Sequence, residues 1–91
     1  MGIIKGKITF IDGSVFDFRE IMGIKEIDYR FHYMDKNMKL ICRWDSAPHH
    51  PEIKSFPYHL HTNKEVLNSP KMNLIKALDE ISLNVIWNIE R

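Results

Sequence analysis

Four of the five histidines of this 91-residue chain lie in one short stretch, the histidine segment (residues 47–61, APHHPEIKSFPYHLH). Imidazole gains and loses a proton near pH 6.5, so two neighbouring histidines can serve as general base and general acid. Such a pair is what metal-independent cleavage of RNA through its 2′-hydroxyl requires. The candidates for proton transfer are His49, His50, His59 and His61.

Charged and aromatic residues near the histidine segment predict how a substrate would be held. Arg43 is expected to stabilise charge on the transferring phosphate, and Asp45 is expected to orient an imidazole. An aromatic side chain of the segment could stack on a base. The residues expected to bind substrate are Arg30, His32, Lys54 and Tyr58.

The same histidines allow two other roles. His59 and His61 are two positions apart, so on a strand they point to one side and could ligate zinc together with His49 or His50. No C-x-x-C pair or H-E-x-x-H helix accompanies them, which makes zinc the weaker interpretation and leaves us expecting no cofactor. Alternatively, the prolines of the segment shape a rigid loop whose histidines only hydrogen-bond backbone carbonyls.

Composition indicates one folded domain over residues 1–91, with 44% hydrophobic and 27% charged residues. The net charge of +1 excludes a globally basic nucleic-acid binder, so any contact with RNA must come from a local patch. Cys42 is the single cysteine and cannot form an internal disulfide. No apolar run approaches about 18 residues and the first ten residues do not resemble a signal peptide, so a cytoplasmic protein without a membrane span is expected.

Alternating apolar residues predict an antiparallel meander. Asp12-Gly13 favours a tight turn between the first two strands, and a polar DKN turn separates the next two. A short strand is expected after the proline-rich loop, in YHLHT and then EVL. The fold class is therefore α+β, with four to five strands. The four main strands are expected at residues 3–11, 15–21, 27–34 and 39–45.

One C-terminal helix is expected to cover one face of this sheet. Ser69 is a candidate N-cap and Pro70 a candidate first helical residue. The core-facing apolar positions, at helical spacing, are Leu74, Leu78, Ile81 and Val85. Unless the domain buries them, apolar residues on the helix's other side could contact a partner protein or a second copy in a homodimer. They are Ile75, Trp87 and Ile89.

A hairpin centred on Lys36-Asn37 would pair Met34 with Lys39 and separate the two faces of the third and fourth strands. One face would be apolar. The other would be polar, would lead directly into the histidine segment, and would carry Arg30, His32, Arg43 and Asp45. Cross-strand ion pairs on a solvated surface are the alternative role for its charged residues.

The run Tyr29 to His61 resembles the TumE family of small toxins from toxin–antitoxin modules. It contains a tyrosine/histidine strand, an R-aromatic-D strand end, and the motifs PHHPE and FPxHxH. Ser46 and Met38 depart from the pattern, where the family often has Asn and Gly, and Met38 suggests a different turn and register. The matching positions are Tyr29, His32, Arg43, Asp45, His49, His50, Glu52, His59 and His61.

The resemblance implies an intracellular toxin with RNA-directed nuclease activity and a cognate antitoxin that also binds DNA. Two other functions remain open from the residues. One is a non-enzymatic module whose histidine segment docks a protein or nucleic acid, and the other is a zinc-assisted nuclease or a structural zinc site.

Overall fold

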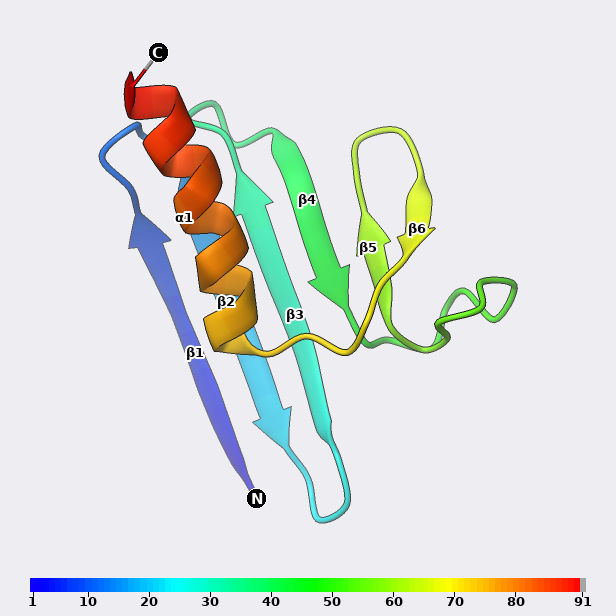
Figure 1. Cartoon of the computed structure of the whole chain (residues 1–91). Helices are drawn as coiled ribbons and strands as arrows, with labels where there is room; N and C mark the ends of the chain where they lie inside the picture. Colours follow the sequence, from blue (N-terminus) through cyan, green and yellow to red (C-terminus); the bar gives the residue numbers. More distant parts are fainter. Residues whose placement is uncertain (91) are drawn as a thin grey trace.

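The computed structural model describes residues 1–90 as one antiparallel sheet with one helix packed on it (Figure 1). The strands follow one another across the sheet in chain order. They are β1 (Gly2–Thr9), β2 (Val15–Met22), β3 (Ile27–Met34), β4 (Leu40–Asp45), β5 (His59–His61) and β6 (Val66–Asn68). The helix is α1 (Leu74–Glu90). The predicted α+β meander with a C-terminal helix is confirmed.

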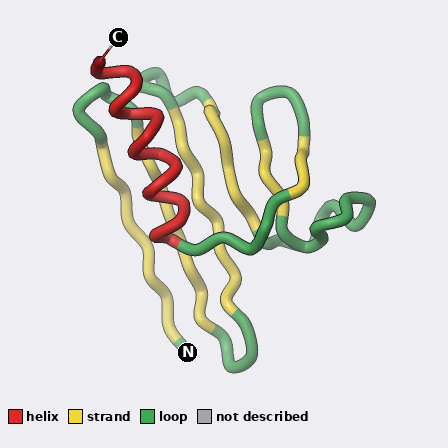
Figure 2. Tube along the Cα trace, viewed as in Figure 1, coloured by secondary structure: helices red, strands yellow, loops and turns green. Residues whose placement is uncertain are grey.

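The predicted number of strands, four to five, is too low because the last hairpin contributes two strands. β5 and β6 have 3 residues each, which is too short for alternation to distinguish a strand from a loop. β5 pairs with β4 on one side and with β6 on the other, and this backbone pairing stabilises the two short strands β5 and β6. Figure 2 shows this hairpin beyond the helix-covered part of the sheet, next to the β4–β5 loop (residues 46–58).

The core lies between α1 and one face of the sheet. Phe16, Phe31 and Tyr33 are almost completely buried, and they meet Ala77 and Ile81 of the helix. Burial of each large apolar side chain contributes about 1.5–3 kcal/mol. The apolar stripe predicted for the helix therefore faces the sheet, and this leaves the opposite sheet face open.

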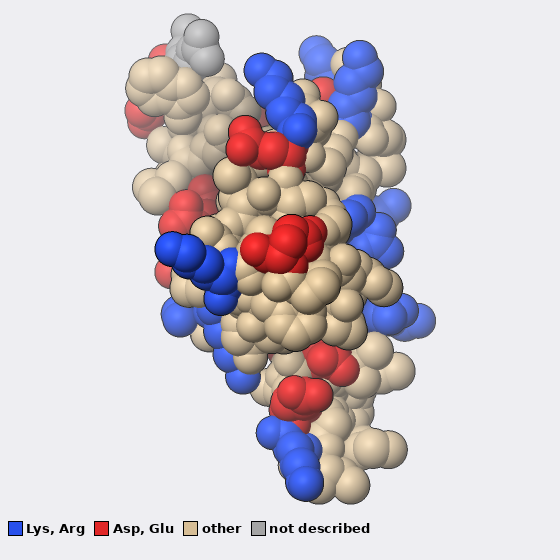
Figure 3. All heavy atoms as spheres, turned by 90° about the vertical axis from the view of Figure 1, so that its right-hand side faces the viewer, with Lys and Arg blue, Asp and Glu red and all other residues tan. Residues whose placement is uncertain are grey.

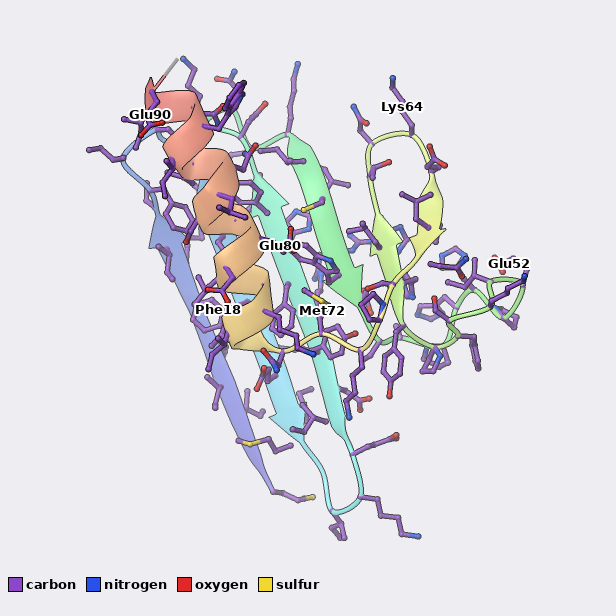
Figure 4. All side chains as sticks on the ribbon, viewed as in Figure 1. Phe18, Glu52, Lys64, Met72, Glu80 and Glu90 are labelled. Atoms are coloured by element: carbon purple, nitrogen blue, oxygen red, sulfur yellow. The ribbon has the colours of Figure 1, made fainter. Side chains whose placement is uncertain are left out.

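Two tyrosines fasten α1 and the segment before it to β3. The backbone N–H of Met72 donates to the Tyr29 hydroxyl at 3.1 Å, and Met72 lies near the start of α1 in Figure 4. The Tyr33 hydroxyl donates to Ser14 Oγ at 2.9 Å and accepts from the side-chain amide of Asn84 at 3.3 Å. These bonds satisfy polar groups that burial would otherwise leave unpaired.

The predicted start of the helix is wrong by four residues. Asn73, and not Ser69, caps α1, because its Oδ1 accepts the backbone N–H of Lys76 at 2.8 Å. Glu20 of β2 accepts the N–H of Leu74 at 3.1 Å, which satisfies a second free donor. Ser69 is buried instead, and its N–H donates to Ser55 Oγ at 3.0 Å.

The predicted register of the β3–β4 hairpin is also wrong, although its two faces are preserved beyond the pair formed by Met34 and Leu40. Met34 pairs with Leu40 instead of Lys39, and a bulge then shifts the pairing so that Tyr33 lies opposite Cys42. The cause is the turn, in which Met38 has a φ of 65° and its N–H donates to the Asp35 carbonyl at 3.0 Å. Beyond the bulge the shift is two residues, which leaves every side chain on its predicted face.

We predict that Met38→Gly stabilises the protein by about 0.5–1 kcal/mol, because glycine adopts a positive φ without steric cost. Met38 is 55% exposed, so little apolar contact is lost with its side chain. Urea unfolding at neutral pH measures the change. Met38→Ala is the matched control, since it removes the same side chain but keeps the β-carbon. Equal stability of the two variants would contradict this explanation of the turn.

Candidate functional site

Polar side chains form two parallel rows across the sheet face that points away from α1. Residues directly opposite one another on antiparallel strands project from the same face, so the register defines each row. The first row, from β2 to β5, is Asp17, His32, Arg43 and His61. The second row is Arg19, Arg30, Asp45 and His59.

The predicted common face of Arg30, His32, Arg43 and Asp45 is thus confirmed by the pairing. Sequence reasoning missed the contribution of β2, namely Asp17 and Arg19. The signal was present, because Phe16 and Phe18 alternate with these two residues and point to the core side. On the far side of β2, Lys7 lies opposite Asp17 and Lys5 lies opposite Arg19.

Two adjoining depressions lie over the rows. The smaller one, about 170 Å³, is lined by Asp17, Arg19, Arg30 and His32. The larger one, about 320 Å³, shares both arginines and continues toward the start of the β4–β5 loop at Ser46. Both are open to solvent, so two guanidinium groups are presented side by side on an accessible surface.

The β4–β5 loop brings His50 to the end of both rows. The ring centres of His59 and His61 are 4.6 Å apart, and those of His50 lie 5.1 Å from His59 and 5.3 Å from His61. We call these three residues the histidine cluster. His59 is the most buried member, at 1% exposure. His50 and His61 are only partly covered, so they are the members that a bound molecule can reach.

Hydrogen bonds fix the rings of two members of the cluster. His59 Nδ1 lies 2.8 Å from the carbonyl oxygen of Pro57, and His50 Nδ1 lies 3.0 Å from Glu52 Oε1. Both partners only accept, so each Nδ1 must carry the proton and each Nε2 is left as the free ring nitrogen of the neutral form. Glu52 stands at the outer end of the loop (Figure 4).

Arg43 and Asp45 form a loose pair beside the cluster. The Nε of Arg43 lies 3.7 Å from Asp45 Oδ2, and this buried nitrogen has no hydrogen-bond partner within residues 1–90. Asp45 also accepts the backbone N–H of Ala47 at 2.7 Å, which fixes the first residues of the loop. Asp45 therefore orients the loop, while the carboxylate that contacts an imidazole belongs to Glu52.

Burial and neighbouring charge lower the pKa of two histidines of the first row. Desolvation, with Arg43 and the two other cluster rings, lowers the pKa of His61 to about 4. Desolvation, followed by Arg30 and Arg43, also lowers the pKa of His32, against a smaller opposite effect of Asp17. Near pH 7 His61 is thus an unprotonated imidazole, and the lowered pKa also makes it a weaker base than free imidazole.

Three residues predicted for the site lie elsewhere. His49 is exposed, and neither a ring contact nor a side-chain hydrogen bond of it occurs within residues 1–90. Lys54 lines a shallow depression with Asn68 at the outer edge of the sheet. Tyr58 is on the core side, where its ring stacks on Tyr29 with centres 6.2 Å apart.

Cys42 is on the core side as well and is poorly suited to nucleophilic chemistry. Desolvation, with a smaller contribution from Glu80, raises the pKa of its thiol to about 11. The thiolate, which is the reactive form, is therefore scarce near neutral pH. Cys42 is thus a small residue of β4 that packs against the core.

The charge on the loop edge is mixed. Figure 3 looks onto the side of the molecule that carries β5, β6 and the β4–β5 loop, and acidic and basic side chains are interspersed there. A phosphate-binding surface of one sign is thus not a feature of this edge. The arginines of the open sheet face are the concentrated positive groups near the histidine cluster.

The family model described as Toxin TumE matches residues 1–86. The chain therefore belongs to the TumE toxin family. A toxin family of this kind implies an antitoxin partner in general. Neither a curated protein nor a solved structure matches the chain. Within residues 1–90, the one helix is neither long nor apolar enough to cross a membrane.

The lowered pKa of His61 predicts a loss of stability in acid. Between its ordinary value of 6.5 and about 4, the unfolded chain binds a proton at this position that the folded chain does not. The free energy of unfolding must therefore decrease as the pH falls through this interval. Replacement by a residue that does not titrate removes this contribution.

Between pH 7 and about pH 4.5, we expect the free energy of unfolding of wild type to fall by about 1–2 kcal/mol more than that of His61→Asn. This figure includes a discount for the partial exposure of His61. Urea unfolding in the presence of EDTA at the two pH values measures the difference. His49→Asn is the control and should follow wild type, because His49 lies outside the cluster. Parallel behaviour of all three proteins would show that His61 is not held neutral by its surroundings.

Proposed function

We propose that this TumE-family toxin acts as a metal-independent endoribonuclease whose active site is the histidine cluster. The observation that carries the proposal is the meeting of three imidazoles at the end of a sheet face that bears three arginines. Proton transfer and phosphate stabilisation are the two requirements of this chemistry, and both kinds of group are adjacent here.

In this reaction the 2′-oxygen of RNA attacks the adjacent phosphorus. A ring nitrogen of His61 accepts the 2′-hydroxyl proton as the new O–P bond forms. The bond to the 5′-oxygen breaks, and His50 donates a proton to that leaving oxygen. The products are a 2′,3′-cyclic phosphate and a 5′-hydroxyl. The centres of the His50 and His61 rings are 5.3 Å apart, so the two rings are neighbours, and in-line transfer requires them to separate slightly to reach the oxygens on opposite sides of one phosphate.

The neighbouring groups have supporting roles. Glu52 holds His50 through its Nδ1 and balances the charge of the ring while it carries the second proton. His59 is too buried to meet RNA, so it positions the other two rings. Arg43 stabilises charge on the phosphate, and Arg19 with Arg30 binds the next phosphates along the strand. His32 extends this surface.

We predict cleavage of single-stranded RNA by the purified toxin, freed of antitoxin, in the presence of EDTA. His50→Ala and His61→Ala should each lower the cleavage rate by about 10²–10⁴, as expected for the loss of a general acid or base. His49→Ala is the matched control and should cleave at close to the wild-type rate. Gel analysis of a labelled oligonucleotide gives the rate, and mass spectrometry identifies the cyclic phosphate.

A substrate with a 2′-deoxy sugar at the cleaved position tests the chemistry, because it lacks the attacking oxygen and should stay intact. Circular dichroism must confirm that each variant is folded. The proposal is wrong if folded, metal-free toxin leaves every tested RNA uncleaved.

For the partner, we propose a cognate antitoxin that binds DNA and covers the outer face of α1. The apolar residues of this face are well exposed and lie within about one third of the helix circumference. They are Ile75, Leu83, Ile86 and Ile89, with exposures of 72%, 68%, 51% and 53%. Exposed apolar stripes of this kind favour a protein contact, and the toxin family supports an antitoxin as the occupant.

We predict that Leu83→Asp combined with Ile86→Asp prevents co-purification with the protein encoded by the adjacent gene and leaves RNA cleavage intact. The outer face of α1 lies across the sheet from the histidine cluster, so the two effects should separate. His49→Asp is the control for an added charge elsewhere on the surface. Retained co-purification of the double variant would exclude this face. If sedimentation shows that the wild-type toxin without antitoxin is a dimer and that the double variant is a monomer, the occupant of this face is a second copy of the chain.

A further inference from the structure

The ring nitrogens of the histidine cluster are close enough to share one metal ion. His50, His59 and His61 each offer a nitrogen, and these three atoms lie within 4.8 Å of one another. Imidazole nitrogens bind Zn²⁺ at about 2.0–2.1 Å, so three ligands around one ion stand about 3.3 Å apart and need only small ring movements here. Of the alternatives left open by the sequence, the third ligand is His50 and not His49.

The hydrogen bonds of the cluster resemble those that support metal-binding histidines. In metal sites the imidazole nitrogen that does not bind the ion donates to a carboxylate or a backbone carbonyl, which fixes the ring. His50 donates from Nδ1 to Glu52, and His59 donates from Nδ1 to the Pro57 carbonyl. Both rings therefore direct Nε2 away from these anchors, and no rearrangement of tautomers is needed for binding.

The charges around the cluster permit a cation. Arg43 lies opposite His61 on the neighbouring strand and is unfavourable. Two carboxylates offset it, since Asp45 lies opposite His59 and Glu52 contacts His50. With neutral imidazoles the net formal charge of these groups is negative. Three histidines would also leave a fourth position of a tetrahedral ion open.

We propose that His50, His59 and His61 form a binding site for a divalent transition metal ion such as Zn²⁺, and that the bound ion inhibits the toxin. The inhibition rests on the proposed nuclease function. Metal coordination occupies the nitrogen lone pair that a general base requires, and it prevents the same ring from carrying a second proton. The metal-free and metal-bound toxin are therefore the active and inactive forms.

Calorimetric titration of ZnCl₂ into EDTA-stripped, dialysed toxin tests the site without any RNA. We expect one Zn²⁺ per chain and affinity weakened by about tenfold or more in His50→Ala and in His61→Asn. His49→Ala should bind as wild type does. His59→Ala is avoided as the sole test because this ring is buried and the variant could fail to fold. A rise in the melting temperature of wild type with Zn²⁺ should accompany binding.

The outcomes separate the site from the nuclease mechanism. Absence of binding to wild type, or equal binding by wild type and both cluster variants, overturns the site. With binding established, RNA cleavage by EDTA-stripped, dialysed toxin that stops on addition of one equivalent of Zn²⁺ supports inhibition. Cleavage that is unchanged by Zn²⁺ overturns inhibition. Cleavage that requires Zn²⁺ also overturns it, along with the metal-independent mechanism, while the binding site itself stands.

Discussion

The candidate site depends on the pairing of β4 with β5. Three residue pairs join the two strands, and they are Arg43–His61, Trp44–Leu60 and Asp45–His59. Alternation sends the middle pair into the core and both outer pairs to the open face. A slip of one residue would expose Trp44 and bury two charged side chains. Burial of Trp44 against the core therefore holds the histidines beside Arg43 and Asp45.

One face of the sheet carries the core, and the other carries the polar residues of the candidate site. α1 and the aromatic residues of β2, β3 and β4 form the core on one face, which frees the other face from packing requirements. Along the second row of that open face, the exposure of the side chains decreases from Arg19 on β2 to His59 on β5. The β4–β5 loop covers the end of the row at β5. Charged groups are accessible where a substrate would be held, and imidazoles are sheltered where protons would move.

Burial and anchoring of the histidine cluster leave nitrogen lone pairs free, which bears on both proton transfer and metal binding. Burial and the nearby guanidinium of Arg43 keep His61 neutral, so its nitrogen lone pair is available near pH 7. Anchoring of His50 and His59 through Nδ1 leaves their Nε2 atoms available as well. Available lone pairs suit a general base, and they equally suit a metal ion. This is why the proposed nuclease and the proposed inhibition by Zn²⁺ arise at one site.

The amino-acid sequence by itself determined the features that depend on neighbours a few positions apart. These are the alternation of the strands, the Asp12-Gly13 turn and the apolar stripe of α1. It also placed Arg30 and His32 on the face of Arg43, because a register shift of two residues does not exchange faces. The contribution of Asp17 and Arg19 could have been found from the same alternation in β2.

Only the tertiary structure decided which histidines lie close together. His49 and His50 are adjacent and chemically identical, and the path of the β4–β5 loop alone brings His50 to His59 and leaves His49 in solvent. Tyr58 is likewise committed to the core by its stacking on Tyr29. The start of α1 depended on Glu20 and Asn73 instead of the local Ser-Pro signal. The contacts of Glu20, Tyr29 and the histidine cluster join residues far apart in the chain or depend on where the loop closes, which local spacing does not encode, whereas the Asn73 cap is a local contact with Lys76.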